Sequence, residues 1–197
     1  MVLGSHNSLS YLPLKHWWQF YTIPWARCQT LTLEEQYNKG VRVFDIRFRF
    51  DKNGNVLFCH NTTIFKYTMD EFIHTLEKFK DVVYIRFVLD MRDNTTESVR
   101  EFRRSKFINV IKNFEEKVPS RIKVNNAHMF NPWEDNYYNS RYIRIFGRYA
   151  SYSDTFFKYL PTKWFAKIFN KNIKELVKFN KSNKQGYIID YIEYAIN

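Results

Sequence analysis

Seven polar residues stand where predicted β-strands end, and their side chains are of the kinds that catalyse phosphoryl transfer. They are His6, Asp45, Arg47, His60, Asp90, Arg148 and Asp190. Splitting a phosphodiester by an internal hydroxyl needs a base, an acid to protonate the leaving oxygen, and fixed positive charge beside the phosphoryl oxygens. Two histidines and an arginine meet that need, so His6, His60 and Arg47 are the first candidates.

The strand predicted for residues 41–50 has two unlike faces. Period-two alternation places Asp45 and Arg47 on one face and a row of large apolar side chains on the other. An ordinary half-exposed strand and a barrel strand whose inner face leads to a site both give this pattern. A plain buried ion pair is the structural alternative, but burying two charges is costly unless they serve a site.

A hairpin is predicted to follow this strand. Residues 51–54 carry a turn signal, and residues 55–60 have the composition of the returning strand. If those four residues form the loop, position 50 faces position 55 and paired numbers sum to 105. Asp45 then faces His60 within hydrogen-bonding reach.

Strands and helices alternate along the rest of the chain. Strands are predicted at residues 1–5, 82–89, 122–124, 142–146 and 186–189, and helices at residues 33–40, 69–80, 96–117 and 161–180. Thr32 is the predicted N-cap of the first helix, and residues 125–140 are the one long irregular stretch. Apolar strands that alternate with helices indicate a parallel α/β sheet or barrel, whose functional residues gather at the carboxyl ends of the strands.

Length and composition limit the organisation of the chain. With 197 residues, 45% of them hydrophobic, residues 1–197 are predicted to form one domain. The net charge of +11 indicates a partner that carries phosphate: nucleic acid, an anionic membrane surface or a small substrate. Cys28 and Cys59 are too few for a disulfide scaffold and form no metal-binding pattern. No signal peptide or spanning segment is visible, so we expect a soluble protein, cytoplasmic or secreted after loss of a leader.

Several short segments match a known family in order and spacing. In the first 80 residues they are residues 2–8 (VLGSHNS), Gln29-Thr30 with Gln36, residues 40–47 (GVRVFDIR) and residues 57–60 (LFCH). These segments resemble the catalytic X region of phosphatidylinositol-specific phospholipases C. Residues 146–149 and 186–192 resemble two segments of the bacterial enzymes: the one with an inositol-binding arginine, and the one whose aspartate orients the first histidine.

The resemblance implies a distorted (β/α)8 TIM barrel and a role for each candidate residue. His6, supported by Asp190, would be the general base that activates the inositol 2-hydroxyl. His60 would protonate the departing diacylglycerol oxygen, which leaves an inositol cyclic phosphate. Arg47 would bind the phosphate and Arg148 the inositol. Because the chain is near the lower length limit for such a barrel, we expect a compact or incomplete one.

Asn7 departs from the bacterial pattern, which usually has aspartate after the first histidine as a helper to the general acid. Here Asp45 is expected to take over that duty, and Asn7 and Asp90 are candidates for substrate binding. Asn7, Asp45 and Asp90 also form a conceivable oxygen-ligand set for calcium. Arg47 opposes it, because a fixed cation repels a second one, so we expect no cofactor. Glycerophosphodiester phosphodiesterases and sphingomyelinase D toxins share the barrel but have Glu-x-Asp where this chain has Asp45-Ile46-Arg47.

Asp90 and an aromatic stretch each have a functional and a structural interpretation. Asp90 is predicted to pair with Arg86 or Arg92 if it has no role in substrate binding. An aromatic stretch, Trp17, Trp18, Phe20, Tyr21 and Trp25, is predicted either to insert at a lipid interface or to pack beside the barrel rim.

Three functions stay open on the sequence. The first is cleavage of phosphatidylinositol or a related inositol phosphodiester by cyclisation, with peripheral contact to an anionic membrane. The second keeps the same residues but acts on a soluble phosphodiester such as a signalling nucleotide. The third is a non-catalytic module that binds phosphate or nucleic acid. The pair of histidines argues against this third reading, because a binding module has no need of two proton-transfer groups, and no obligatory nucleic acid is expected.

Overall fold

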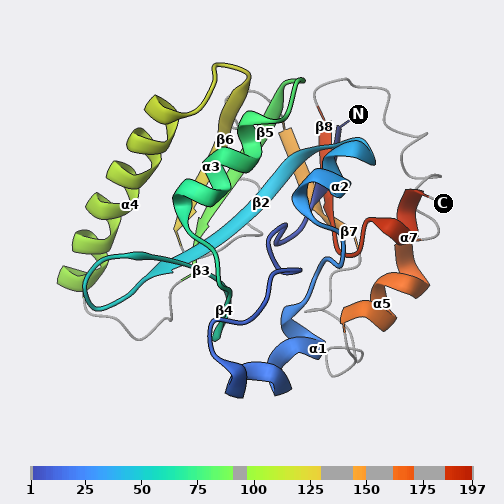
Figure 1. Cartoon of the computed structure of the whole chain (residues 1–197), viewed down its shortest axis with the longest axis horizontal. Coiled ribbons are helices and arrows are strands. Elements are labelled where there is room, and N and C mark those ends of the chain that lie inside the picture. The colour runs from blue at the N-terminus through green and yellow to red at the C-terminus, as the bar shows by residue number, and fades with distance from the viewer. Residues whose placement is uncertain (1, 91–96, 130–143, 150–161, 171–184, 197) are drawn as a thin grey trace.

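Six parallel strands form the centre of the molecule (Figure 1). The computed structural model describes residues 2–90, 97–129, 144–149, 162–170 and 185–196. The strands are β1 (Val2–Ser5), β2 (Val41–Phe50), β5 (Val83–Leu89), β6 (Ile122–Met129), β7 (Arg144–Tyr149) and β8 (Gln185–Ile189). They pair in the order β7-β8-β1-β2-β5-β6, every pair parallel. This α/β sheet is what the alternating strands and helices predicted.

The sheet stays open within the described ranges, since no pairing there joins β6 to β7. Closure into a (β/α)8 barrel therefore stays a prediction, as does the single domain over residues 1–197. The strand β6 extends to Met129, so the prediction that the chain becomes irregular from residue 125 was wrong for its first five residues. Residues 130–140 of that stretch lie outside the described part.

Two short strands extend the sheet beside β2. The strand β3 (Val56–His60) is antiparallel to β2, and β4 (Thr63–Ile64) is antiparallel to β3. The pairing of β3 with β2 ends at Phe58, which lies opposite Phe48. Beyond Phe58, β3 pairs with β4 alone. His60 is thereby carried away from β2 and toward the carboxyl end of β1.

The register of this hairpin differs by one residue from the predicted one, because paired numbers sum to 106 instead of 105. The Asp51 N–H donates to the Asn55 carbonyl at 3.0 Å. The Asp51 carboxylate accepts from the N–H groups of Asn53 and Asn55, both at 2.8 Å. Gly54 completes the three-residue loop at φ +84°, a conformation that costs glycine little. The prediction that Asp45 faces His60 was therefore wrong.

Two of the helices begin at capping boxes. The helices are α1 (Ile23–Ala26), α2 (Leu33–Asn38), α3 (Met69–Glu77), α4 (Glu97–Lys117), α5 (Thr162–Phe169) and α7 (Glu193–Ile196), with a 3-10 helix η1 (Trp17–Thr22) before α1. Thr32 and Glu35 form a capping box at α2, as the predicted N-cap requires, and Thr68 and Glu71 form another at α3. The remainder of the helix predicted for residues 161–180 lies outside the described part. In the described ranges, no helix is long and apolar enough to cross a membrane.

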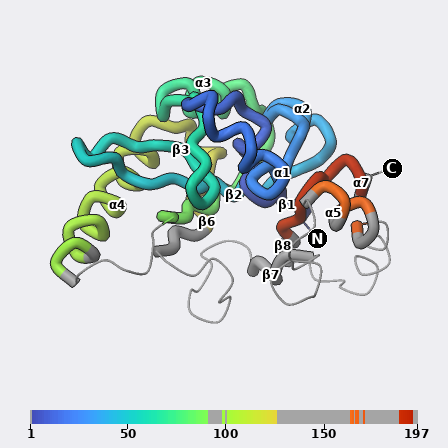
Figure 2. Tube along the Cα trace, turned by 90° about the horizontal axis from the view of Figure 1, so that it is seen from below, coloured from blue at the N-terminus to red at the C-terminus, as the bar shows by residue number. Residues whose placement is uncertain are grey.

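The core lies between the sheet and the helices α2, α3 and α4, and Figure 2 shows α2 and α3 on the same side of β2. From Phe44 onward the even-numbered side chains of β2 point into it: Phe48 packs on Phe107 of α4 with ring centroids 5.5 Å apart. Phe72 of α3 stacks on Phe114 of α4 at 5.7 Å. Val43, an odd-numbered residue, instead packs with Ile188 in a second, small cluster. Val41 packs in the main core with the even-numbered residues, so the predicted alternation is confirmed from Val43 onward.

Candidate active site

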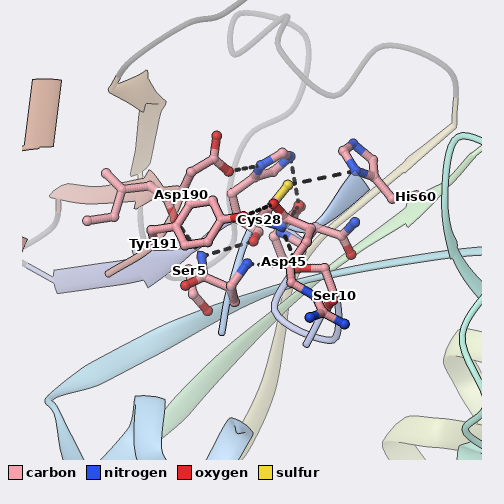
Figure 3. Close-up of polar contacts among 12 residues, drawn as sticks. Ser5, Ser10, Cys28, Asp45, His60, Asp190 and Tyr191 are labelled. Atoms are coloured by element: carbon pink, nitrogen blue, oxygen red, sulfur yellow. Dashed lines mark hydrogen bonds and ion pairs between the residues drawn. The ribbon is translucent and has the colours of Figure 1, made fainter. Parts of the chain in front are cut away.

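The candidate residues meet at the carboxyl ends of neighbouring strands (Figure 3). His6 directly follows β1, and Asp190 directly follows β8. The His6 N–H donates to the Ile189 carbonyl at 2.9 Å, which joins the two strand ends. The Gln29 side-chain amide donates to the carbonyls of both His6, at 3.1 Å, and Ile189, at 2.8 Å. These backbone contacts fix the position from which the His6 ring projects.

The His6 ring has a defined tautomer. Its Nδ1 contacts the carboxylate of Asp190, and its Nε2 lies 2.7 Å from Nη2 of Arg47. A guanidinium only donates hydrogen bonds, so Nε2 is the acceptor and carries no proton. The ring is then neutral with its proton on Nδ1, where the Asp190 carboxylate accepts it. His6 is therefore in the state that a general base requires.

Asp45 lies at the centre of a buried ionic network. Its carboxylate contacts Nε of Arg47 at 3.2 Å and Nη1 of Arg86 at 3.0 Å, and it accepts from the Asn7 N–H at 3.0 Å. Burial alone raises the pKa of Asp45, but the two guanidinium groups, with the Asn7 N–H, bring that pKa well below its ordinary value. Asp45 is thus a permanent anion that orients Arg47.

Arg86 or Arg92 was the predicted structural partner of Asp90. Arg86 forms an ion pair with Asp45, and Arg92 lies outside the described residues. Asp45 and Arg86 are direct partners in the parallel pairing of β2 with β5. The register between β2 and β5 would have predicted the contact between Asp45 and Arg86. Sequence spacing alone does not determine how two parallel strands align.

His60 lies perpendicular to His6, with ring centroids 5.6 Å apart. Its Nδ1 is 2.8 Å from the Ala26 carbonyl, which only accepts, so Nδ1 is the donor. The proton that His60 can release to a leaving group is then on Nε2. The helper predicted for His60 was Asp45; the described contact of its Nδ1 is instead the end of α1.

Cys28 was not among the candidates, yet its Sγ lies 3.7 Å from Nδ1 of His60 (Figure 3). The Cys28 N–H donates to Oγ of Ser10 at 2.9 Å, and its carbonyl accepts from the Tyr191 N–H. The residue follows α1 and lies 32 positions before His60. The sequence held no spacing signal for it.

The three predicted substrate-binding residues have different surroundings. The Asn7 side-chain amide is buried and makes no hydrogen bond within the described part of the chain. The Asp90 carboxylate accepts from the Asn61 N–H at 2.7 Å and so holds the turn that follows His60. Burial, with Asp90 beside it, raises the pKa of the Cys59 thiol to about 12. Arg148 lies in β7 opposite Ile188, but its side chain is outside the described part.

Comparison with solved structures gives the fold a name. The phosphatidylinositol-specific phospholipase C of Listeria monocytogenes matches with a TM-score of 0.60 and 18% identity, over 99% of this chain and 91% of that one. The F249X variant of the phosphatidylinositol-specific phospholipase C from Staphylococcus aureus matches with a TM-score of 0.66 and 16% identity, over 96% and 85%. The fold is that of bacterial phosphatidylinositol-specific phospholipases C. No model of a protein family matches the chain, and no curated protein matches its sequence.

At these identities the likeness to phosphatidylinositol-specific phospholipases C concerns the fold alone. The chemistry of this chain depends on the side chains that it places at the carboxyl ends of the strands. Those side chains are a neutral histidine held by a carboxylate, a second histidine at right angles to it, and a buried arginine between a carboxylate and the first histidine.

Proposed function

We propose that the chain cleaves a phosphodiester by attack of a neighbouring hydroxyl of the same substrate, with release of a cyclic phosphate. The observation that carries this proposal is the His6 tautomer: an unprotonated Nε2, fixed by Asp190 and facing a guanidinium. When a phosphate oxygen accepts the hydrogen bond that Arg47 now donates to Nε2, that nitrogen can accept the proton of the attacking hydroxyl. The fold likeness to phosphatidylinositol-specific phospholipases C supports the same reaction class.

The step conserves protons across the pair of histidines. Nε2 of His6 takes the hydroxyl proton while the hydroxyl oxygen bonds to phosphorus. The bond from phosphorus to the leaving oxygen breaks, and Nε2 of His60 protonates that oxygen. Asp190 stabilises the imidazolium that forms on His6. Positioned proton transfer of this kind contributes about 10²–10⁴-fold to the rate.

Charge balance supports an anionic substrate. The carboxylates of Asp45 and Asp190 offset the guanidinium groups of Arg47 and Arg86, so these four groups sum to zero. A protonated His60 then adds one positive charge, which a phosphodiester anion neutralises. The buried amide of Asn7 has hydrogen-bonding capacity for a substrate oxygen or hydroxyl.

An inositol phosphodiester of a membrane lipid is the proposed substrate, because an aromatic surface adjoins the site. Its members are the large exposed side chains of η1 and α1: Trp17, 81% exposed, Phe20, 65%, Tyr21, 59%, Trp18, 50%, and Trp25, 47%. The same segment ends at Ala26, whose carbonyl holds His60. Aromatic residues insert at the boundary between water and lipid, and the net charge of +11 adds attraction to an anionic surface. The exposure of these side chains favours insertion at a lipid interface over packing beside the barrel rim.

The proposed reaction needs no metal ion. The calcium set of Asn7, Asp45 and Asp90 would use a carboxylate that two arginines already neutralise, and Asp90 is engaged with the turn after His60. Activity is therefore expected to persist in a calcium chelator. Loss of activity in the chelator, restored by calcium, would overturn this part of the proposal.

Phosphorus NMR of the full chain with a panel of phosphodiesters tests the function. We expect a cyclic phosphate from phosphatidylinositol vesicles, lost in His6→Ala and in His60→Ala. His74→Ala is the matched control, because His74 is exposed and pairs with Glu77 on α3. Turnover of a soluble nucleotide without lipid cleavage would move the substrate to the soluble class. Binding without turnover would replace the enzyme by a phosphate-binding module.

A further inference from the structure

Cys28 and the two site histidines form a cluster that the cleavage reaction does not use as a whole. One ligand atom from each of His6, Cys28 and His60 lies within 4.8 Å of the other two, and all three residues are buried. We infer that this cluster binds Zn²⁺, or a similar thiophilic divalent cation, at the centre of the site. Two imidazoles and a thiolate are a donor set that zinc accepts, with a fourth position for water.

The distance between the sulfur and the nearer histidine nitrogen fits such an ion. Zinc bonds of about 2.3 Å to sulfur and about 2.05 Å to nitrogen, at a tetrahedral angle, place those two atoms about 3.6 Å apart. Sγ of Cys28 and Nδ1 of His60 are 3.7 Å apart. The Cys28 backbone is held on both sides, by Ser10 through its N–H and by Tyr191 through its carbonyl. The thiol is thus positioned before any ion arrives.

The contact between Asp190 and His6 is the outer part of a zinc site. Histidine ligands usually donate their second ring N–H to a carboxylate, which fixes the tautomer and leaves the other nitrogen for the metal. In His6, Nδ1 contacts Asp190, and Nε2, now beside Arg47, is the nitrogen left for the metal. Arg47 has to withdraw from Nε2 when the ion binds, and it keeps its contact with Asp45 through Nε.

Binding changes the protonation of two ligands. Cys28 coordinates as a thiolate, and its proton passes to solvent. The His60 imidazolium releases to solvent the Nδ1 proton that it now donates to the Ala26 carbonyl, and it binds the ion as a neutral ring with its proton on Nε2. The thiolate supplies the negative charge that the calcium set lacks, because there both arginines neutralise Asp45. This is why a thiophilic ion fits where calcium does not.

Cobalt(II) added to the reduced full-length chain reports the thiolate directly. We expect a thiolate-to-cobalt charge-transfer band in the near ultraviolet that saturates at one ion per chain. The band disappears in Cys28→Ser and persists in Cys59→Ser, the matched control, since Cys59 is the other buried cysteine but contacts Asp90 instead of the cluster. Absence of the band in the unsubstituted chain, or its loss in Cys59→Ser, would overturn the inference.

Competition with a chromophoric chelator measures the zinc affinity of the same variants, with circular dichroism to confirm that each is folded. Loss of an outer-shell carboxylate lowers metal affinity by about 10–100-fold, so Asp190→Asn should weaken zinc binding by that factor. Cys28→Ser and His60→Ala each remove a direct ligand, and each should weaken zinc binding by at least as much. Equal affinities for Cys28→Ser and the unsubstituted chain would refute the site. Both measurements are made without substrate, so they stand or fail independently of the proposed cleavage. If both proposals hold, zinc inhibits cleavage and a chelator restores it.

Discussion

The two faces of β2 use burial for opposite purposes. On the even-numbered face, Phe44, Ile46 and Phe48 are fully buried in the apolar core. On the odd-numbered face, Asp45 and Arg47 are buried as charges, each with named partners. An apolar side chain needs only the right shape and volume, whereas a buried charge needs a specific partner. Changes on the even face should therefore alter stability, and changes on the odd face should alter chemistry as well.

Among variants of β2, Arg47→Lys gives the largest expected effect on rate. Lysine keeps the charge but lacks the planar fork that reaches Asp45 and His6 together. We expect kcat for the phosphodiester to fall by about 10²–10³-fold, the usual loss when one preorganised donor to the reacting group is removed. Steady-state kinetics on vesicles measure it.

Arg42→Lys is the matched control on the same strand. Arg42 pairs with Asp81 at the surface, far from the carboxyl end of β2. The kcat of Arg42→Lys should match that of the unsubstituted chain. Equal rates for the Arg47 and Arg42 variants would show that the odd face of β2 has no special part in the reaction.

Asp45→Asn should reduce stability most. The variant leaves Arg47 and Arg86 without the anion between them, and removing one partner of a buried ion pair costs about 3–5 kcal/mol. Denaturant unfolding at pH 7 measures this loss.

The effect of Asp45 also has a defined pH dependence. Its folded-state pKa lies below the unfolded value of about 3.9, so the folded state binds fewer protons in acid. The stabilisation is complete above that unfolded value and is lost as the pH falls toward the folded pKa. The difference in unfolding free energy between the unsubstituted chain and Asp45→Asn should therefore narrow below about pH 4. A constant difference across that range would contradict the assigned charge.

Local signals explain what the sequence predicted well. The Thr32 and Glu35 capping box and the alternation along β2 lie within ten residues, where hydrogen-bond geometry and side-chain period decide the structure. The predicted hairpin register was wrong by one residue. The turn pattern counts Asp51 as part of the loop, whereas the Asp51 carboxylate accepts a hydrogen bond from the Asn55 N–H and closes a shorter loop.

Long-range alignment explains what the sequence missed. The partnership of Asp45 with Arg86 depends on how two parallel strands align, and the place of Cys28 depends on a loop that Ser10 and Tyr191 hold. Neither is encoded in any short spacing. Residue types predicted the candidate histidines and arginine, whereas pairing between distant segments decided which groups surround them.

Ile46→Val tests the even face with the smallest possible change. Ile46 lies between Asp45 and Arg47 in sequence but points to the opposite side, where it is fully buried. Removing one methylene should cost about 1 kcal/mol of unfolding free energy. Because the charged network is untouched, kcat should stay the same. A fall in kcat comparable to that of Arg47→Lys would mean that the two faces are coupled through the strand.

Lys78→Ala is expected to give the smallest effect and completes the comparison with charges that are not buried. Lys78 contacts Glu34 at 2.6 Å, closer than either arginine contacts Asp45, yet about half of each side chain is exposed to water. The hydrogen bond to Glu34 raises the pKa of Lys78, but solvent and salt screen such a pair, and many exposed pairs contribute nothing measurable. Urea midpoints of the unsubstituted chain and Lys78→Ala should therefore coincide at 0.15 M salt, within about the error of the method. A shift as large as that of Asp45→Asn would show that the distance between charges outweighs their burial in this protein. The stabilising effect of the Asp45 network would then not depend on its exclusion from water.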